Sequence, residues 1–138
     1  MRRAATIFCL LMCFVVEAHS ELVVIVHPQT NLDEISDRQL AMIFLSKTKY
    51  LPNGTRARPV EISSMTTKNH FYSRVAGKQE VELRKYWATV IFSGKGQPPK
   101  QFKSAASVLR YVASKPGAIA YIPRDSISPS VKVVKTIK

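Results

Sequence analysis

The sequence predicts an α/β domain in which a central, mainly parallel or mixed sheet is flanked by helices. Apolar runs without polar alternation occur at Leu22–Val26 and Ala118–Ile122, and such runs are typical of strands buried on both faces. Segments with apolar residues at helical spacing lie between the candidate strands. Strands and helices that alternate along the chain define the α/β class, and a length of 138 residues suits one small domain.

The N-terminus has the pattern of a secretory signal peptide. Arg2 and Arg3 form a basic region, Ala4–Val16 is apolar, and small residues precede a cleavage point after Ser20. A membrane anchor is the alternative, but the apolar run is shorter than the roughly 20 residues that a spanning helix needs. We therefore expect residues 1–20 to be a cleaved signal and residues 21–138 to be the exported, periplasmic domain.

Both cysteines, Cys9 and Cys13, lie in the predicted signal. Residues 21–138 therefore contain no cysteine, which excludes disulfides, thiol catalysis and cysteine-ligated metals from the exported form.

The exported domain is strongly basic. Removing residues 1–20 leaves 21 − 2 = 19 Lys and Arg and 9 − 1 = 8 Asp and Glu, a net charge of +11. A positive charge spread along the chain favours anionic partners such as phosphate-like ligands, lipid headgroups or acidic surfaces. General solubility is the alternative explanation, and nucleic acid is not an expected partner of an exported protein.

The first half of the domain predicts strand, helix, turn and strand. Leu22–Val26 is typical of a parallel sheet under helices. Ser36 and Gln39 form a capping-box pattern, which predicts a helix from Asp37 to about Leu45. Residues 50–55 contain an Asn-Gly turn, and residues 59–62 form a short second strand. The helix should bury three apolar side chains: Leu40, Ile43 and Phe44.

The middle of the chain predicts a polar loop and two helices. The loop spans Ser63–Lys68, and a helix of about residues 68–75 ends at Gly77. A second helix, Val81–Phe92, has one apolar face. Trp87 on this face is expected to be a core anchor, with ligand stacking as the alternative. The face comprises Leu83, Tyr86, Trp87, Val90 and Ile91.

The last third begins with a loop at residues 94–100, which lacks the spacing of a phosphate-binding Walker loop. Ser104 should cap a helix that ends at Gly117. The alanines of strand 118–122 leave room on one face for a closely packed helix, and residues 131–134 form a final strand. The helix should bury four apolar side chains: Ala105, Val108, Leu109 and Val112.

Three segments carry a resemblance to a known family. Residues 115–122 read KPGAIAYI, residues 35–47 read ISDRQLAMIFLSK, and a W-x4-F-x-G-x-G-x-P-P pattern runs from Trp87 to Pro99. Together they resemble the phosphate-binding proteins of bacterial ABC uptake systems. The resemblance implies a type 2 periplasmic-binding-protein-like fold, of which 118 residues make about one lobe. A lone lobe would offer an open half-cleft or a site that another chain completes.

The loop Ser63–Lys68 is the candidate ligand-binding site. It follows a strand and precedes a helix, where backbone N–H groups, hydroxyls and Lys68 can hold an oxyanion. In the resemblance, Thr67 and Lys68 match a phosphate loop, while Glu61 stands at the position of an Arg. Ordinary helix capping is the alternative. The candidate residues are Ser63, Ser64, Thr66, Thr67 and Lys68.

No catalytic or metal motif is evident. His27 and His70 lack metal-ligand spacing, and no nucleophile-elbow motif is present. We therefore expect no enzyme activity, no metal and no cofactor.

Two functions follow as hypotheses. The resemblance implies an exported solute-binding protein that holds phosphate or another small oxyanion for uptake or sensing, with an ABC permease or other envelope protein as partner. The alternative is a non-enzymatic envelope interaction module that has lost ligand binding. No transmembrane segment is expected after signal cleavage.

Overall fold

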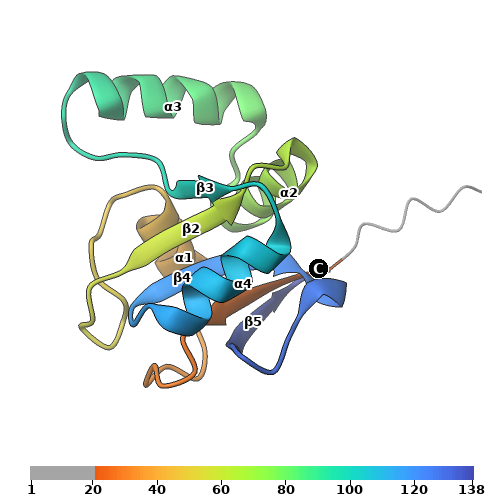
Figure 1. Cartoon of the computed structure of the whole chain (residues 1–138). Coiled ribbons are helices and arrows are strands. Elements are labelled where there is room, and N and C mark those ends of the chain that lie inside the picture. The colour runs from red at the N-terminus through yellow and green to blue at the C-terminus, as the bar shows by residue number, and fades with distance from the viewer. Residues whose placement is uncertain (1–20) are drawn as a thin grey trace, which may run out of the picture.

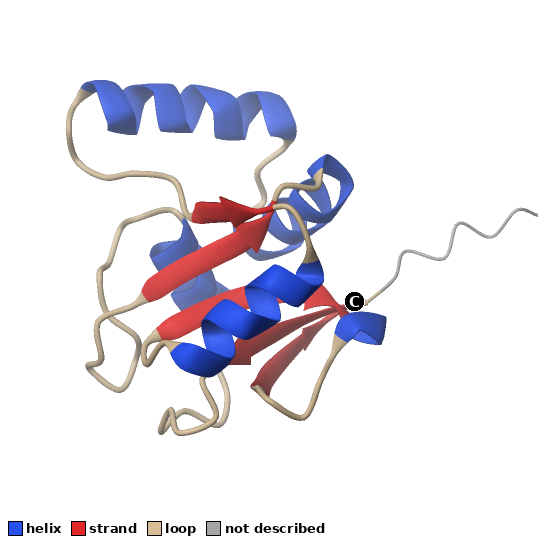
Figure 2. Ribbon diagram, in the orientation of Figure 1, coloured by secondary structure: helices blue, strands red, loops and turns tan. Residues whose placement is uncertain are grey.

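The computed structural model describes residues 21–138, so the predicted signal peptide lies outside the described residues. A five-stranded sheet is flanked by helices (Figures 1 and 2). A short 3-10 helix precedes the last strand. The elements in chain order are β1 (Leu22–Val26), α1 (Asp37–Phe44), β2 (Arg58–Ile62), α2 (Met65–Ala76), α3 (Glu80–Phe92), β3 (Lys100–Phe102), α4 (Ala105–Ser114), β4 (Ala118–Pro123), the 3-10 helix (Arg124–Ser126) and β5 (Lys132–Ile137).

The sheet is mixed, with strand order β3-β2-β4-β1-β5. Strands β3, β2 and β4 are parallel, whereas β1 is antiparallel to both of its neighbours. The expectation that β1 lies among parallel strands is therefore wrong. Its uninterrupted apolar sequence reflects burial of all five residues on both faces of the sheet, a condition that either strand direction can meet.

The two faces of the sheet carry different cores. Helices α1 and α2 cover one face, where aromatic rings gather, and Phe71 stacks on Tyr121 at 3.8 Å between ring centroids. Helix α4 covers the opposite face (Figure 1). There Ala118 and Ala120 pack in one cluster with the valines of α4, so the expected room above the alanines is filled by that helix.

Local end signals of the helices are confirmed. The Ser36 hydroxyl accepts the N–H of Gln39, and the Gln39 side chain accepts the N–H of Ser36, which completes the capping box of α1. Ser104 caps α4. Gly117 has φ of 82°, and a Cβ at this position would collide with the carbonyl oxygen of Arg56, so only glycine fits.

Helix α3 departs from the prediction. It stands beside the β3 edge and covers neither face of the sheet (Figure 1). Of its predicted apolar face only Leu83 is buried, while Trp87 is half-buried and Ile91 is exposed. Trp87 packs on Tyr86 and on the margin of the core, so it is not the fully buried anchor expected. Helical periodicity identifies an apolar stripe but does not show what covers it.

Strand β3 was not predicted. It spans Lys100–Phe102 and begins at the last residue of the predicted loop, and two of its three residues are exposed and polar. Short, charged strands are usual at a sheet edge, and they lack the apolar alternation that would reveal them. Within residues 21–138 no helix has the length and apolar character needed to cross a membrane.

Candidate functional site

The carboxyl ends of β2 and β3 meet at one edge of the sheet, and two helices begin there. The two strands are parallel neighbours, and the N–H of Ser63 donates to the carbonyl of Phe102 at 2.9 Å. Helix α2 follows β2 on one face, whereas α4 follows β3 on the other. This is a topological switch point, the place where open α/β sheets bind ligands.

The predicted loop residues lie at this switch point, but most of them are helical. Helix α2 begins at Met65, so the expected loop is reduced to Ser63 and Ser64, and the expected start near Lys68 is wrong. The N-cap is Ser64, whose hydroxyl accepts the N–H of Thr67 at 3.4 Å. This cap overrides the turn-like composition of the segment and brings Thr66, Thr67 and Lys68 into the first helical turn, directly after Ser63 and Ser64.

The candidate residues differ in what they offer a ligand. Ser63 and Thr66 are exposed. Ser64 and Thr67 are half-buried and already share the capping hydrogen bond. Lys68 is the cation of the group, with 20% of its side chain exposed.

Lys68 forms an ion pair with Glu61, which the sequence did not predict. Its ammonium lies 3.6 Å from an oxygen of Glu61, a residue that is 1% exposed. The other carboxylate oxygen accepts from the hydroxyls of Tyr121 at 2.7 Å and Tyr72 at 3.1 Å. Gln101 donates to the first oxygen at 3.3 Å. The buried carboxylate is therefore fully partnered, as buried charges require.

Glu61 points into the aromatic face of the sheet and is shielded from solvent. It would repel a bound anion if it faced the site; instead, its charge is met by donors from β4, α2 and β3. Sequence reasoning missed Tyr72, Tyr121 and Gln101. The available signal was one carboxylate in an otherwise apolar strand, which requires buried donors nearby.

The two tyrosines remain hydrogen-bond donors at all ordinary pH values. Burial, followed by the charge of Glu61, raises the pKa of Tyr121 and of Tyr72 well above the usual value. Protonated phenols donate to the carboxylate, so the same contacts that stabilise Glu61 keep the phenols neutral. Within residues 21–138 no group of three His, Cys, Asp or Glu side chains could hold a metal.

The arrangement of sheet and helices is similar to one lobe of a periplasmic-binding-protein fold. Solved structures similar to it are phosphate ABC transporter substrate-binding proteins. The sequence itself matches no family model and no curated protein.

Three of these structures show how similar the folds and sequences are. A Clostridium perfringens protein, assigned as a phosphate ABC transporter substrate-binding protein and solved with bound phosphate, has a TM-score of 0.65 and 16% identity. An ABC-type phosphate transport receptor from Vibrio cholerae has a TM-score of 0.66 and 18% identity. PstS from Borrelia burgdorferi has a TM-score of 0.56 and 17% identity.

Each match covers 84% of this chain and, respectively, 45%, 46% and 47% of the solved structure. The chain thus spans less than half the length of the proteins that it resembles. At these identities the likeness is one of fold.

Proposed function

We propose that the domain is a solute-binding-like lobe that binds a small oxyanion such as phosphate at the carboxyl end of β2. The observation that carries the proposal is the position of the segment Ser63–Lys68. It lies at the switch point of a fold whose neighbours are phosphate-binding proteins, one of them solved with bound phosphate.

The first turn of α2 supplies suitable chemistry. Backbone N–H groups and the positive end of the helix dipole attract an anion, and the hydroxyls of the exposed residues Ser63 and Thr66 can donate to its oxygens. Lys68 adds a positive charge, which its ion pair with Glu61 partly neutralises. Because that charge is partly compensated, we expect an affinity of about millimolar, equivalent to about 4 kcal/mol.

The protein would act in the periplasm after removal of residues 1–20. There it would serve uptake or sensing, together with an ABC permease or another envelope protein. The role is non-enzymatic, since holding an oxyanion requires only donors and charge. The distributed positive charge of the domain would raise the local concentration of anions.

Thermal unfolding with phosphate and sulfate at constant ionic strength tests the proposal. At 100 times Kd a ligand stabilises a fold by about 2.7 kcal/mol, a shift of several degrees in Tm. Lys68→Gln should remove the shift, whereas Lys85→Gln, an exposed α3 lysine, should keep it. Absence of any shift, or the same shift in Lys68→Gln, contradicts oxyanion binding at this site.

A second candidate function, the envelope interaction module, is favoured by one observation. Helix α3 exposes large apolar side chains, and Phe92 at its end is 96% exposed. Val81 and Ile91 are also more than half exposed. Ile91 and Phe92 are adjacent at the C-terminal end of α3, and neighbouring exposed apolar groups are typical of an interaction surface. Under this function Lys68→Gln leaves partner binding intact.

A further inference from the structure

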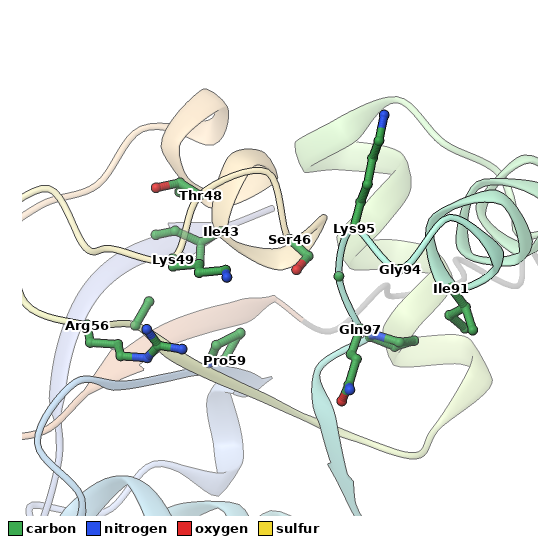
Figure 3. A pocket seen from close by; sticks show the side chains of 13 residues that line it. Ile43, Ser46, Thr48, Lys49, Arg56, Pro59, Ile91, Gly94, Lys95 and Gln97 are labelled. Carbon is green, nitrogen blue, oxygen red and sulfur yellow. The ribbon is translucent and has the colours of Figure 1, made fainter.

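A hollow of about 600 Å³ lies at the opposite, amino-terminal end of β2 (Figure 3). Its walls come from three connecting segments: residues 46–49 after α1, residues 56–59 leading into β2, and residues 94–98 after α3. Pro59 and Ile91 contribute apolar surface. None of the predicted site residues lies here.

The hollow is lined by cations without carboxylates. Lys49 and Arg56 extend into the hollow, whereas the Lys95 side chain points away from them (Figure 3). Among residues 21–138 no Asp or Glu lines it, and no ion pair involves these three side chains. Lys68, at the other end of β2, has an ion-pair partner.

A second hollow of about 300 Å³ adjoins the first and shares Ile43 and Thr48 with it. It is lined mainly by apolar surface and by Arg38, again without an Asp or Glu among the described residues. Tyr50 on its wall is 54% exposed. We call these two neighbouring hollows, which are basic and partly apolar, the β2 entry groove.

The wall of the β2 entry groove is built on unusual backbone. Ser46 has φ of 59°, and within residues 21–138 no other non-glycine residue has a positive φ. A Cβ on Gly96 would come within 2.5 Å of the Ser46 hydroxyl, so Gly96 lets the loop after α3 pack against Ser46. The positive φ of Ser46 belongs to the end of α1, where the N–H of Ser46 donates to the carbonyl of Ile43 and the N–H of Lys47 donates to the carbonyl of Met42. The backbone strain that a non-glycine residue has in this conformation lies in the groove wall.

We propose that the β2 entry groove docks an extended acidic segment of a partner protein, with apolar side chains between its carboxylates. Arg56 can take a carboxylate in bidentate geometry, and Lys49 adds a second charge. The apolar side chains would lie on the exposed surface of Ile91, Met42 and Tyr50. This assigns a surface and a partner chemistry to the second candidate function and does not depend on oxyanion binding.

Other occupants fit less well. A free oxyanion would use one cation and leave the connected apolar surface empty. A second copy would place a domain of charge +11 against another of the same charge, which electrostatic repulsion disfavours. A planar anionic membrane would reach the rim and leave Lys49 and Arg56 inside the hollow.

Fluorescence anisotropy with a labelled peptide of alternating Glu and Leu tests the proposal, using protein purified after expression of the full chain. A matched peptide with Gln in place of Glu should bind about tenfold or more weakly. The double variant Lys49→Gln with Arg56→Gln should lose about tenfold or more in affinity for the Glu peptide. A matched double variant, Lys85→Gln with Lys103→Gln, loses the same charge outside the groove and should keep it.

Each alternative occupant gives a different result. Absence of peptide binding, equal binding of the two peptides, or equal loss in the two double variants overturns the proposal. It is also overturned if Lys49→Gln with Arg56→Gln abolishes binding to vesicles of anionic phosphatidylglycerol or abolishes self-association in sedimentation, while peptide binding persists. Lys68→Gln should leave peptide binding unchanged, so failure here and failure of oxyanion binding remain distinguishable.

Discussion

Among residues 21–138, positive charge is paired with a carboxylate at one end of β2 and is without a carboxylate partner at the other end. At the carboxyl end, Lys68 lies beside Glu61, whose carboxylate also accepts from two buried tyrosines. At the amino-terminal end, Lys49 and Arg56 line a hollow with no carboxylate among the described residues. The end at which the fold conventionally binds ligands is therefore internally compensated, and the uncompensated charge lies at the other end.

This difference teaches that position in the fold and available charge need to be judged separately. A switch point supplies helix N-termini whatever the side chains are. Whether an anion binds tightly there depends on donors that are not already occupied. Substitutions at the carboxyl end of β2 test how strongly the hydrogen-bond network of Glu61 stabilises the protein. A substitution at Ser46 tests whether the opposite end depends on strained backbone.

The largest effect is expected from Glu61→Ala. Removing the carboxylate takes the acceptor from Tyr121 and Gln101 and leaves Lys68 without its partner. Tyr72 keeps only the carbonyl of Phe44, at 3.5 Å. Breaking a buried charged network costs about 3–5 kcal/mol. Urea denaturation should show a loss of free energy of unfolding in this range.

Glu80→Ala provides the control for this prediction. Glu80 pairs with Arg84 on α3 at i,i+4 spacing, and its other oxygen accepts from Asn69 at 3.5 Å. These partly exposed contacts contribute about 1 kcal/mol in total, so this variant should lose much less stability than Glu61→Ala. If Glu61→Ala destabilises no more than Glu80→Ala does, the buried network is not a stabilising feature.

The next effect is a loss of stability in alkali. The raised pKa values of Tyr72 and Tyr121 mean that the unfolded chain releases these protons above about pH 10, while the native protein retains them. The unfolded state then binds fewer protons, so the free energy of unfolding is unaffected below this pH and falls above it. The slope should be about 1.4 kcal/mol per pH unit for each tyrosine.

Urea denaturation at pH values on either side of about 10 measures this slope. Tyr72→Phe should reduce it by the contribution of one tyrosine. Tyr50→Phe is the matched control, because Tyr50 is 54% exposed and belongs to no buried network. Equal slopes in the wild type and in Tyr72→Phe would show that the buried phenols do not govern alkaline stability.

A smaller effect is expected from Glu61→Gln on ligand binding. The amide keeps an oxygen acceptor for a tyrosine but removes the negative charge beside Lys68. The freed ammonium should strengthen phosphate binding by up to about 1 kcal/mol, or roughly fivefold. Titration calorimetry with phosphate measures the change, and an unaltered or weaker affinity contradicts the view that Glu61 competes for Lys68.

The parts of the fold that were predicted correctly carry local signals. The apolar strand Leu22–Val26, the capping box at Ser36 and the left-handed Gly117 are each specified by a few adjacent residues. The prediction failed at β3 and at the start of α2. Lys100–Phe102 is too short and polar to show periodicity, and Thr66 and Thr67 are polar β-branched residues that suggest a loop.

The place of the segment Ser63–Lys68 after β2 follows from the sequence, but its contacts do not. The contact between Glu61 and Tyr121 joins residues 60 positions apart, and no local pattern specifies such a pair. The β2 entry groove likewise unites three loops through the packing of Ser46 against Gly96. Sequence periodicity gives the elements, whereas the partner of each charge depends on how distant segments pack.

The smallest effect concerns the strained wall of the β2 entry groove. Ser46→Gly removes the steric penalty that a non-glycine residue has at a positive φ of 59°. Glycine also raises the conformational entropy of the unfolded chain, which opposes this gain. We expect a net stabilisation of about 0.5–1 kcal/mol. Ser36→Gly, at a position with extended backbone and a capping hydroxyl, is the contrasting control and should destabilise by a few tenths of a kcal/mol. If strain at Ser46 maintains the groove, Ser46→Gly should raise the urea midpoint yet weaken acidic-peptide binding. A gain in stability with unchanged peptide binding would mean that the wall does not need its strain.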